Sequence, residues 1–416
     1  MNMHVRPPRK PTAAEEAILA DFERAAASLP GNDAVMEARR AAISAFERDG
    51  LPTRRVEAWH YTDLRSALRT LPVTAGEGEV IAPLVEGGQT VSLSAAANTN
   101  AGMSIEPIAD RLKEGTLFVA PSRPFDTIGQ LNAAFANGGV TLSVPAGAKS
   151  NEPVELQAVP NEGQTHFRNA VEIGSDTNAT IIERHTDGGA GLATTVTDVT
   201  VGEGAELLYV IVQERDEDGF HLGQINFGLG ANARLTLFVL NMGAKVSRHE
   251  VNVDVAGEGA DFQLRGVNLL GGDRLTDVTM VVSHLVPNTT SEEIIRNVGT
   301  GSGRGVFQGQ IKVAQVAQKT DAKMSCNTLL LSDEAEFAAK PELEIFADDV
   351  ACGHGATVDD LDPNHQFYLM ARGIPEKTAN ALLVKGFVDE MLEAIEHEGL
   401  STALEEAIDR WLERNT

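Results

Sequence analysis

Four short segments that share one pattern decide the fold: IGSDTNA at residues 173–179, VGEGA at 201–205, LGANA at 229–233 and AGEGA at 256–260. Each segment ends in alanine and precedes a strand-like run. The final alanines stand at positions 179, 205, 233 and 260, so the spacings are 26, 28 and 27 residues. A turn and strand that recur at such a period are typical of a β-solenoid, in which successive coils stack on one another. A β-sandwich with regularly spaced turns is the alternative that this pattern leaves open.

The composition fits a stacked aliphatic core. Short β-branched runs separated by Gly, Asn and Asp extend from about residue 91 to 350, and VNVDV at 251–255 alternates as a half-buried strand does. Aromatic residues make up only 5% of the 416 residues, whereas glycine occurs 39 times. Ladders of aliphatic side chains can fill the interior of a solenoid without large rings, so both numbers favour this fold.

Helical patterns flank the β region. Thr12 is placed to cap a first helix that carries Glu15 and Glu16 in its early turns, and a second helix is predicted from Val35 to Arg48. After Asp362-Pro363 the pattern becomes helical again, with an apolar face formed by residues 374, 382, 383, 387, 391, 392 and 395. Gly399 is predicted to end that helix, and a last helix spans 401–412. This amphipathic tail either packs on its own domain or docks a partner.

Charge and missing motifs exclude several classes of function. The formal net charge of −26 disfavours nucleic acid and anionic membrane surfaces as partners. No apolar run is long enough for a transmembrane helix, and the basic N-terminal stretch lacks the apolar core of a secretory signal. We therefore expect a cytoplasmic protein with both cysteines, Cys326 and Cys352, as free thiols. The chain has no G-x-x-x-x-G-K-[ST] motif, so we expect no nucleotide site, and the glycine-rich stretch 299–305 is interpreted as a turn.

One constellation could carry metal chemistry. Cys352 and His354 lie two residues apart, and on a strand such residues share a face. Thiolate and imidazole together suit iron or zinc, but two ligands do not complete a site, so Cys326 or another chain must supply the rest. The alternative is a buried cysteine beside a histidine in a turn. Four other histidines are interpreted as surface or packed residues rather than ligands: His185, His221, His249 and His284.

Several motifs together resemble the SufB/SufD family of iron–sulfur cluster assembly proteins. They are CNTLLLS at 326–332, KPELEI at 340–345, DDVACGHGAT at 348–357 and FYLMARGI at 367–374, together with RVEAWHYT at 55–62. Within the family, the SufB branch carries E-H-E-A-T where this chain has GHGAT at 353–357, so the SufD branch is favoured. Cys326 departs from the SufD pattern, and no role is assigned to it.

The resemblance implies a fold and an assembly. It implies a mainly-β chain, with a right-handed parallel β-helix over residues 91–355 between helical regions at 1–90 and 356–416. It implies a non-catalytic scaffold subunit of a SufBCD-type complex that pairs with a SufB-like paralogue and binds a SufC-like ATPase. In isolation, a homodimer is the alternative to the heterocomplex.

The resemblance also implies site residues. His354 and Cys352 match candidate ligands of a transient iron–sulfur cluster shared with the paralogue. The C-terminal helices are expected to bind the ATPase, with Leu382, Phe387 and Met391 on the docking face. Two rival hypotheses remain at this point. One is a carbohydrate-active β-helix enzyme such as a polysaccharide lyase, and the other is a purely structural partner in which Cys352 and His354 only pack.

Overall fold

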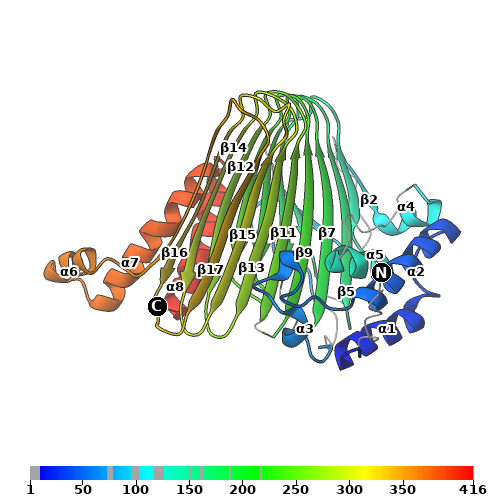
Figure 1. Ribbon diagram of the computed structural model, residues 1–416, viewed down its shortest axis with the longest axis horizontal. Helices are drawn as coiled ribbons and strands as arrows, with labels where there is room; N and C mark the ends of the chain where they lie inside the picture. The colour runs from blue at the N-terminus through cyan, green and yellow to red at the C-terminus, as the bar shows by residue number, and fades with distance from the viewer. Residues whose placement is uncertain are drawn as a thin grey trace, which may run out of the picture.

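The computed structural model describes residues 10–72, 78–94, 103–116, 126–149, 152–159, 163–186, 189–215 and 218–415. Within these residues the chain winds into a β-solenoid made of two facing sheets of nine strands each (Figure 1). From β3 on, successive strands alternate between the sheets, and every strand pair is parallel except β2 with β3. Parallel pairing between strands about one coil apart confirms the predicted solenoid and excludes the β-sandwich.

The two sheets are named here after their last strands. The β18 sheet contains β1 (Gln89–Ser92), β4 (Val154–Gln157), β6 (Asn178–His185), β8 (Glu206–Gln213), β10 (Arg234–Asn241), β12 (Asp261–Leu270), β14 (Thr290–Gly299), β16 (Asp321–Leu330) and β18 (Ala351–Asp359). The β17 sheet contains β2 (Ser104–Pro107), β3 (Val140–Val144), β5 (Thr165–Ile173), β7 (Leu192–Val201), β9 (Phe220–Leu229), β11 (Val246–Val255), β13 (Leu275–His284), β15 (Arg304–Val313) and β17 (Glu336–Ile345). One apolar core fills the space between the two sheets.

The quoted segments form the turns that lead from the β17 sheet to the β18 sheet. Each turn contains one residue with positive φ, and these residues recur coil after coil: Asp176, Gly204, Asn232, Gly259, Asn288 and Lys319. Gly, Asn and Asp tolerate this conformation best, which explains why the repeat is visible in the sequence. The register corrects one part of the prediction. The amide of Glu206 bonds to the carbonyl of Thr177, so Thr177, and not Ala179, stacks with Ala205.

Close contact between stacked turns explains the first glycine of each segment. A Cβ on Gly257 would lie 2.0 Å from the backbone carbonyl carbon of Gly230, and a Cβ on Gly202 would lie 2.7 Å from the amide nitrogen of Ser175. These distances are too short for any side chain to occupy. The turns therefore approach one another backbone to backbone, and only glycine permits that spacing.

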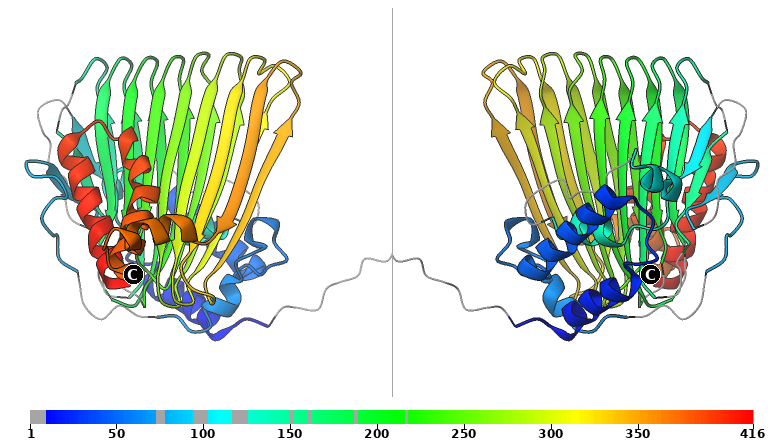
Figure 2. Two further views of the ribbon diagram at one scale, coloured as in Figure 1. Left: turned by 90° about the vertical axis from the view of Figure 1, so that its left-hand side faces the viewer. Right: turned by 90° about the vertical axis from the view of Figure 1, so that its right-hand side faces the viewer.

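Helices cover the outer faces of the two sheets. The N-terminal helices pack on the β17 sheet: α1 (Ala13–Ala25), α2 (Asp33–Asp49), η1 (Glu57–Trp59), α3 (Leu64–Ala67), α4 (Ile108–Glu114) and α5 (Thr127–Phe135). The C-terminal helices α7 (Glu376–Asp389), η2 (Glu390–Ala394) and α8 (Glu398–Asn415) pack on the β18 sheet, whereas α6 (Pro363–Ala371) contacts α7. Figure 2 shows the two groups of helices on opposite sides of the solenoid.

Details of the helices test the sequence predictions. Thr12 caps α1 as predicted, and its hydroxyl and the Glu15 carboxylate form a reciprocal capping box. The prediction for Gly399 was wrong, because this residue lies in the first turn of α8 and the preceding helical segment already ends at Ala394. Among the described residues, no helix is both long and apolar enough to span a bilayer. Residues 1–9, which contain most of the basic N-terminal stretch, lie outside the described residues.

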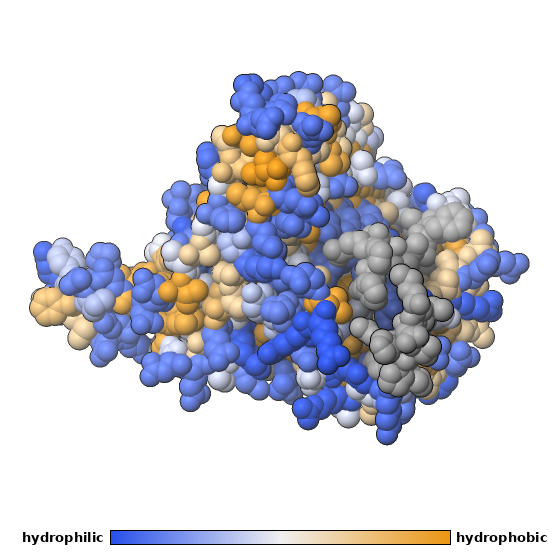
Figure 3. Space-filling model, viewed as in Figure 1, coloured by the Kyte–Doolittle hydropathy of each residue, from blue (hydrophilic) through white to orange (hydrophobic). Residues whose placement is uncertain are grey.

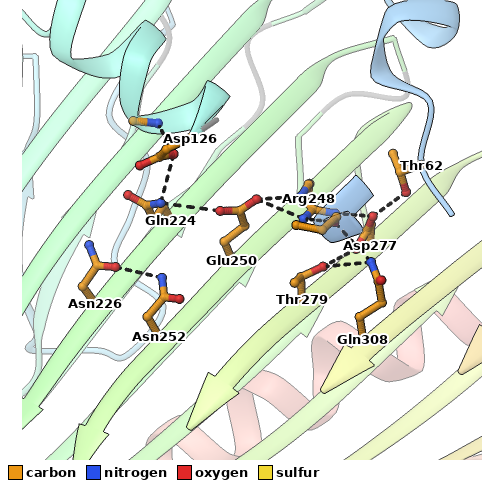
Figure 4. Close-up of polar contacts among 12 residues, drawn as sticks. Thr62, Asp126, Gln224, Asn226, Arg248, Glu250, Asn252, Asp277, Thr279 and Gln308 are labelled. Atoms are coloured by element: carbon orange, nitrogen blue, oxygen red, sulfur yellow. Dashed lines mark hydrogen bonds and ion pairs between the residues drawn. The ribbon is translucent and has the colours of Figure 1, made fainter. Parts of the chain in front are cut away.

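A buried polar network fastens the N-terminal region to the β17 sheet (Figure 4). Arg248 is fully buried and forms ion pairs with Asp277 and Glu250, and its guanidinium carbon lies 3.9 Å from the centroid of the Trp59 ring. Thr62 donates a hydrogen bond to the same Asp277 carboxylate. The RVEAWHYT motif at 55–62 thus docks the N-terminal segment on the solenoid, because Arg248 also donates to the Ala58 carbonyl and the Trp59 ring covers its guanidinium.

The stacking of glycine turns leads to a stability prediction. Gly257→Ala should lower the free energy of unfolding by about 1–3 kcal/mol or more, because the new Cβ meets backbone atoms of the neighbouring coil. Gly228→Ala is the matched control, since a Cβ there would meet nothing within 4 Å, and it should change stability by less than about 0.5 kcal/mol. Thermal and denaturant unfolding of both variants provide the measurement. Equal losses in the two variants would contradict the stacking geometry.

Candidate functional site

Cys352 and His354 lie at the open end of the solenoid. Both belong to β18, which is the last strand of its sheet and pairs only with β16. Cys352 pairs with Ala322 and His354 pairs with Met324, and both partners are interior residues of the apolar core. The structure therefore brings the two side chains to one face, the face that continues the interior of the solenoid.

In the part of the chain that the structure describes, no further coil covers this end, so the interior face becomes accessible there. The Cys352 side chain is half-buried, whereas His354 is exposed. A shallow hollow is lined by Lys323, Met324, Ala351, Cys352, Gly353 and His354. Among the described residues, no group of three or more His, Cys, Asp or Glu side chains could hold a metal ion. Within the described residues, Cys352 and His354 thus provide only part of a metal site built from His, Cys, Asp and Glu side chains.

The local charges disfavour a free thiolate at this site. Burial raises the pKa of the Cys352 thiol above its usual range, and the negative charges of Asp321 and of ionised Glu293 raise it further. The thiol is consequently protonated at neutral pH in the unliganded chain. A bound cation would reverse this balance, because coordination requires the thiolate and stabilises its charge.

Cys326 does not join the two candidate ligands. It lies on the interior face of β16, pairs with Ala356, and is completely buried. Burial raises the pKa of its thiol to about 12, so the thiol is protonated and a poor nucleophile at neutral pH. The Asn297 side-chain amide lies 3.3 Å from the Cys326 sulfur. Cys326 is therefore part of the packed interior.

The asparagine beside Cys326 belongs to a ladder that the sequence analysis missed. Asn241 donates to Asn268 over 2.6 Å, Asn268 donates to Asn297 over 2.7 Å, and Asn297 donates to the Thr328 hydroxyl over 3.1 Å. These residues occupy one register position in successive strands of the β18 sheet. The ladder satisfies interior amides that would otherwise be costly to bury. A polar residue at one fixed place in each coil was the signal that could have revealed it.

The four histidines singled out in the sequence are packed in the interior. The ring centroids of His185 and His221 lie 4.1 Å apart, and those of His221 and His249 lie 5.0 Å apart. His185 pairs with Glu183 over 2.9 Å. Burial lowers the pKa of His249 to about 3 and that of His284 to about 4, so both rings are neutral at physiological pH. These placements confirm the interpretation of the four histidines as packed residues.

A second residue that sequence reasoning missed lies beneath the candidate site. Glu293 occupies the same interior row as Met324 and His354, because Glu293 pairs with Met324 and Met324 pairs with His354. Its side chain is fully buried, and neither carboxylate oxygen has a hydrogen-bond partner with ordinary geometry. Burial raises the pKa of Glu293 to about 8, and the Ser291 hydroxyl offsets only part of the shift. A protonated carboxyl thus lies one strand behind the Met324–His354 pair.

Comparison with known proteins decides the family. The model of the SUF system FeS cluster assembly SufBD core domain matches residues 156–387, and the model of the SufBD protein N-terminal region matches residues 15–70. The core match alone spans more than half of the chain. The chain belongs to the SufBD family. Family members are generally non-catalytic scaffold components of the SUF system, so this assignment favours the assembly hypothesis over the carbohydrate-active alternative.

Individual relatives agree with this assignment. The chain is 28% identical over 381 residues to the iron-sulfur cluster assembly protein SufD of Escherichia coli, an alignment that covers 85% of this chain and 87% of the relative. It is 26% identical over 301 residues to an iron-sulfur cluster assembly SufBD family protein of Synechocystis, with 68% and 66% covered. These similarities support the SufD-like character inferred from the motifs.

The three residues predicted to bind a partner differ in how far they are exposed. Leu382 is exposed at 48%, Phe387 is partly buried beneath the Arg296 guanidinium, and Met391 is buried in the core that joins the tail to the β18 sheet. The three therefore do not form one accessible face. Three residues of α6 that were not predicted are also exposed: Phe367 at 74%, Tyr368 at 56% and Met370 at 43%. Figure 1 shows α6 projecting away from the solenoid.

The buried carboxyl leads to a prediction about pH. The folded-state pKa of Glu293 is raised from 4.5 to about 8, so the folded protein binds the proton more tightly than the unfolded chain does. Stability from this group is therefore full at acidic pH and is lost as the pH rises from 4.5 to about 8. At pH 8.5 the free energy of unfolding of Glu293→Gln should exceed that of the wild type by on the order of a few kcal/mol. The difference should be smaller at pH 5.

Thermal unfolding of both proteins between pH 5 and 8.5 measures this difference. The matched control is Glu334→Gln, since Glu334 is exposed in a turn and its replacement should leave the pH profile unchanged. A difference between the wild type and Glu293→Gln that stays constant across this range would contradict the proposed state of Glu293.

Proposed function

We propose that the chain is a scaffold subunit of a SUF assembly complex that builds an iron–sulfur cluster at its open final coil. It pairs there with a SufB-like paralogue and binds a SufC-like ATPase through its C-terminal helices. Cys352 and His354 are the ligands that this chain offers to the nascent cluster. The observation that carries the proposal is the uncovered interior face of β18, on which a thiol and an imidazole lie side by side.

The open coil has the features of a pairing surface. β17 and β18 each have one unpaired strand edge, and an exposed edge is a template for a further strand. Apolar side chains are exposed in corresponding turns of the last three coils, namely Leu285, Val316 and Phe346, and Ile345 adjoins them. Figure 3 shows apolar side chains gathered at the top of the solenoid. A partner that covered this end would bury the edges and this apolar stripe together.

The paralogue would also complete the metal site. Two donors from this chain leave coordination positions for donors from a second chain, and iron–sulfur clusters are held mostly by thiolates with occasional imidazoles. The cluster is thus cargo at an interface and not a resident group of one subunit. The raised pKa of Cys352 fits this role, since the thiol releases its proton only when metal arrives.

The C-terminal helices are the proposed ATPase contact. Because the sequence contains no P-loop motif, nucleotide hydrolysis must come from a partner. In α6 the side chains of Phe367, Tyr368 and Met370 are exposed, and no residue of this helix is buried. Together with Leu382 they offer the apolar anchors that dominate helix docking. Of the three residues that the resemblance implies for this contact, Leu382 is exposed, whereas Phe387 is partly buried and Met391 is buried.

Substitution of the two donors tests the cluster site. In a reconstituted complex with the paralogue and the ATPase, the variant Cys352→Ala/His354→Ala should lose most cluster assembly, because both ligands of this chain are removed. The measurement is the rate of anaerobic cluster formation, followed by its visible absorption. Cys326→Ala and His60→Ala are the matched controls, since one thiol is buried elsewhere and the other histidine is exposed in the N-terminal region. Wild-type assembly by the double variant would refute the role of these donors.

A crossed pair of substitutions tests the two docking surfaces. Phe367→Ser should weaken ATPase binding by about 2 kcal/mol, the usual loss at an aromatic anchor, and leave binding of the paralogue unchanged. Phe346→Ser should do the reverse, because it lies in a turn of the final coil. Both side chains are exposed, so neither substitution should unfold the chain. Affinities measured for each partner separately decide between the assignments, and losses that appear with the opposite partner would overturn them.

A further inference from the structure

The hollow at the open end contains a third potential donor of a different chemical kind. Met324 lines it together with Cys352 and His354, and its thioether is a soft sulfur donor. We propose that Met324, Cys352 and His354 form a site for a soft monovalent cation, Cu(I), on this chain alone. The proposal does not depend on cluster assembly, although copper and a cluster would compete for the same two residues.

The strand register places the three donors together. Met324 pairs directly with His354, and Cys352 lies two residues from His354 on the same face of β18. Side chains directly opposite on neighbouring strands have Cβ atoms about 5 Å apart, close enough for both to reach one ion. All three residues line the hollow, and the Met324 sulfur would join the other two donors by turning away from Gly309.

Met324 is held at the floor of the hollow by a glycine. A Cβ on Gly309, in the facing sheet, would lie 2.5 Å from the Met324 sulfur, so the thioether occupies the space that this glycine leaves free. Met324 is itself 3% exposed. Because methionine is unbranched and has three rotatable bonds, its sulfur can turn from Gly309 toward the hollow without a change in the backbone.

Chemistry and charge select the cation. Thiolate and thioether sulfur favour Cu(I), and imidazole also binds copper. One thiolate neutralises a monovalent ion, so the liganded site carries no net charge, which suits a half-buried location. A divalent ion in the same three-donor site would keep a positive charge there. A thioether ligand also distinguishes this site from the two-donor arrangement proposed for the cluster.

Anaerobic titration of the purified full-length chain with Cu(I), in competition with bicinchoninate, measures the site. One Cu(I) should bind per chain, and Met324→Leu should weaken binding by about tenfold or more, since even residues that only support ligands contribute that much. Leucine conserves the volume, so Met324→Leu should fold normally. Met370→Leu, on exposed α6, and Cys326→Ala, in the interior, are the controls that should leave the affinity unchanged.

Copper-edge X-ray absorption of selenomethionine-labelled protein provides a direct readout. The chain has nine methionines, and the proposal predicts one selenium neighbour of the copper, which disappears in Met324→Leu. Absence of stoichiometric Cu(I) binding would overturn the proposal. So would binding without a selenium neighbour, or an affinity that Met324→Leu does not change. None of these outcomes depends on the paralogue or the ATPase, so they are distinguishable from failure of the proposed assembly function.

Discussion

Each turn that leads from the β17 sheet to the β18 sheet lies with its backbone against the backbone of the same turn in the preceding coil. This contact leaves no room for a side chain at Gly202 or Gly257, and a residue with positive φ recurs in these turns from Asp176 to Lys319. Together these requirements fix where each coil begins, and with it the register of every strand pair. The interior rows follow from that register, because side chains two residues apart share a face. The position of every candidate donor depends on this stacking.

The same register explains why the chemistry collects at one end. Within the solenoid, several interior polar groups are paired with one another, as in the asparagine ladder from Asn241 to Asn297 and the Glu183–His185 pair. At the last coil the interior rows continue, but no further strand of the described residues covers them. The side chains of Cys352 and His354 therefore lie on the interior face and are still accessible. A solenoid must protect its ends, and here the uncovered end also carries the only thiol that is not fully buried. Protection of the end and completion of a ligand set would therefore be achieved by one binding event.

The parts of the fold that sequence analysis predicted are those controlled by local chemistry. The turn residues and the capping box at Thr12 depend on neighbouring backbone groups, and both are confirmed. The spacing of 26 residues between Ala179 and Ala205 did not give the true register, because Thr177 occupies in its turn the place that Ala205 takes in the next. Glu293 and the asparagine ladder were missed, since a polar residue in an alternating strand does not reveal which face it occupies until the register is known. The burial of Met391 was missed for a related reason, because an amphipathic helix does not show which surface it covers.

The central claim is that the open edge of β18 is completed by a second β-solenoid subunit. Hydrogen–deuterium exchange of residues 351–359, with and without the SufB-like paralogue, tests it most directly. We expect residues 351–359 to exchange rapidly in the isolated chain and to be strongly protected in the complex. Strand β10, in the middle of the solenoid, should exchange slowly in both states. A stable complex in which exchange at 351–359 remains as rapid as in the isolated chain would contradict it.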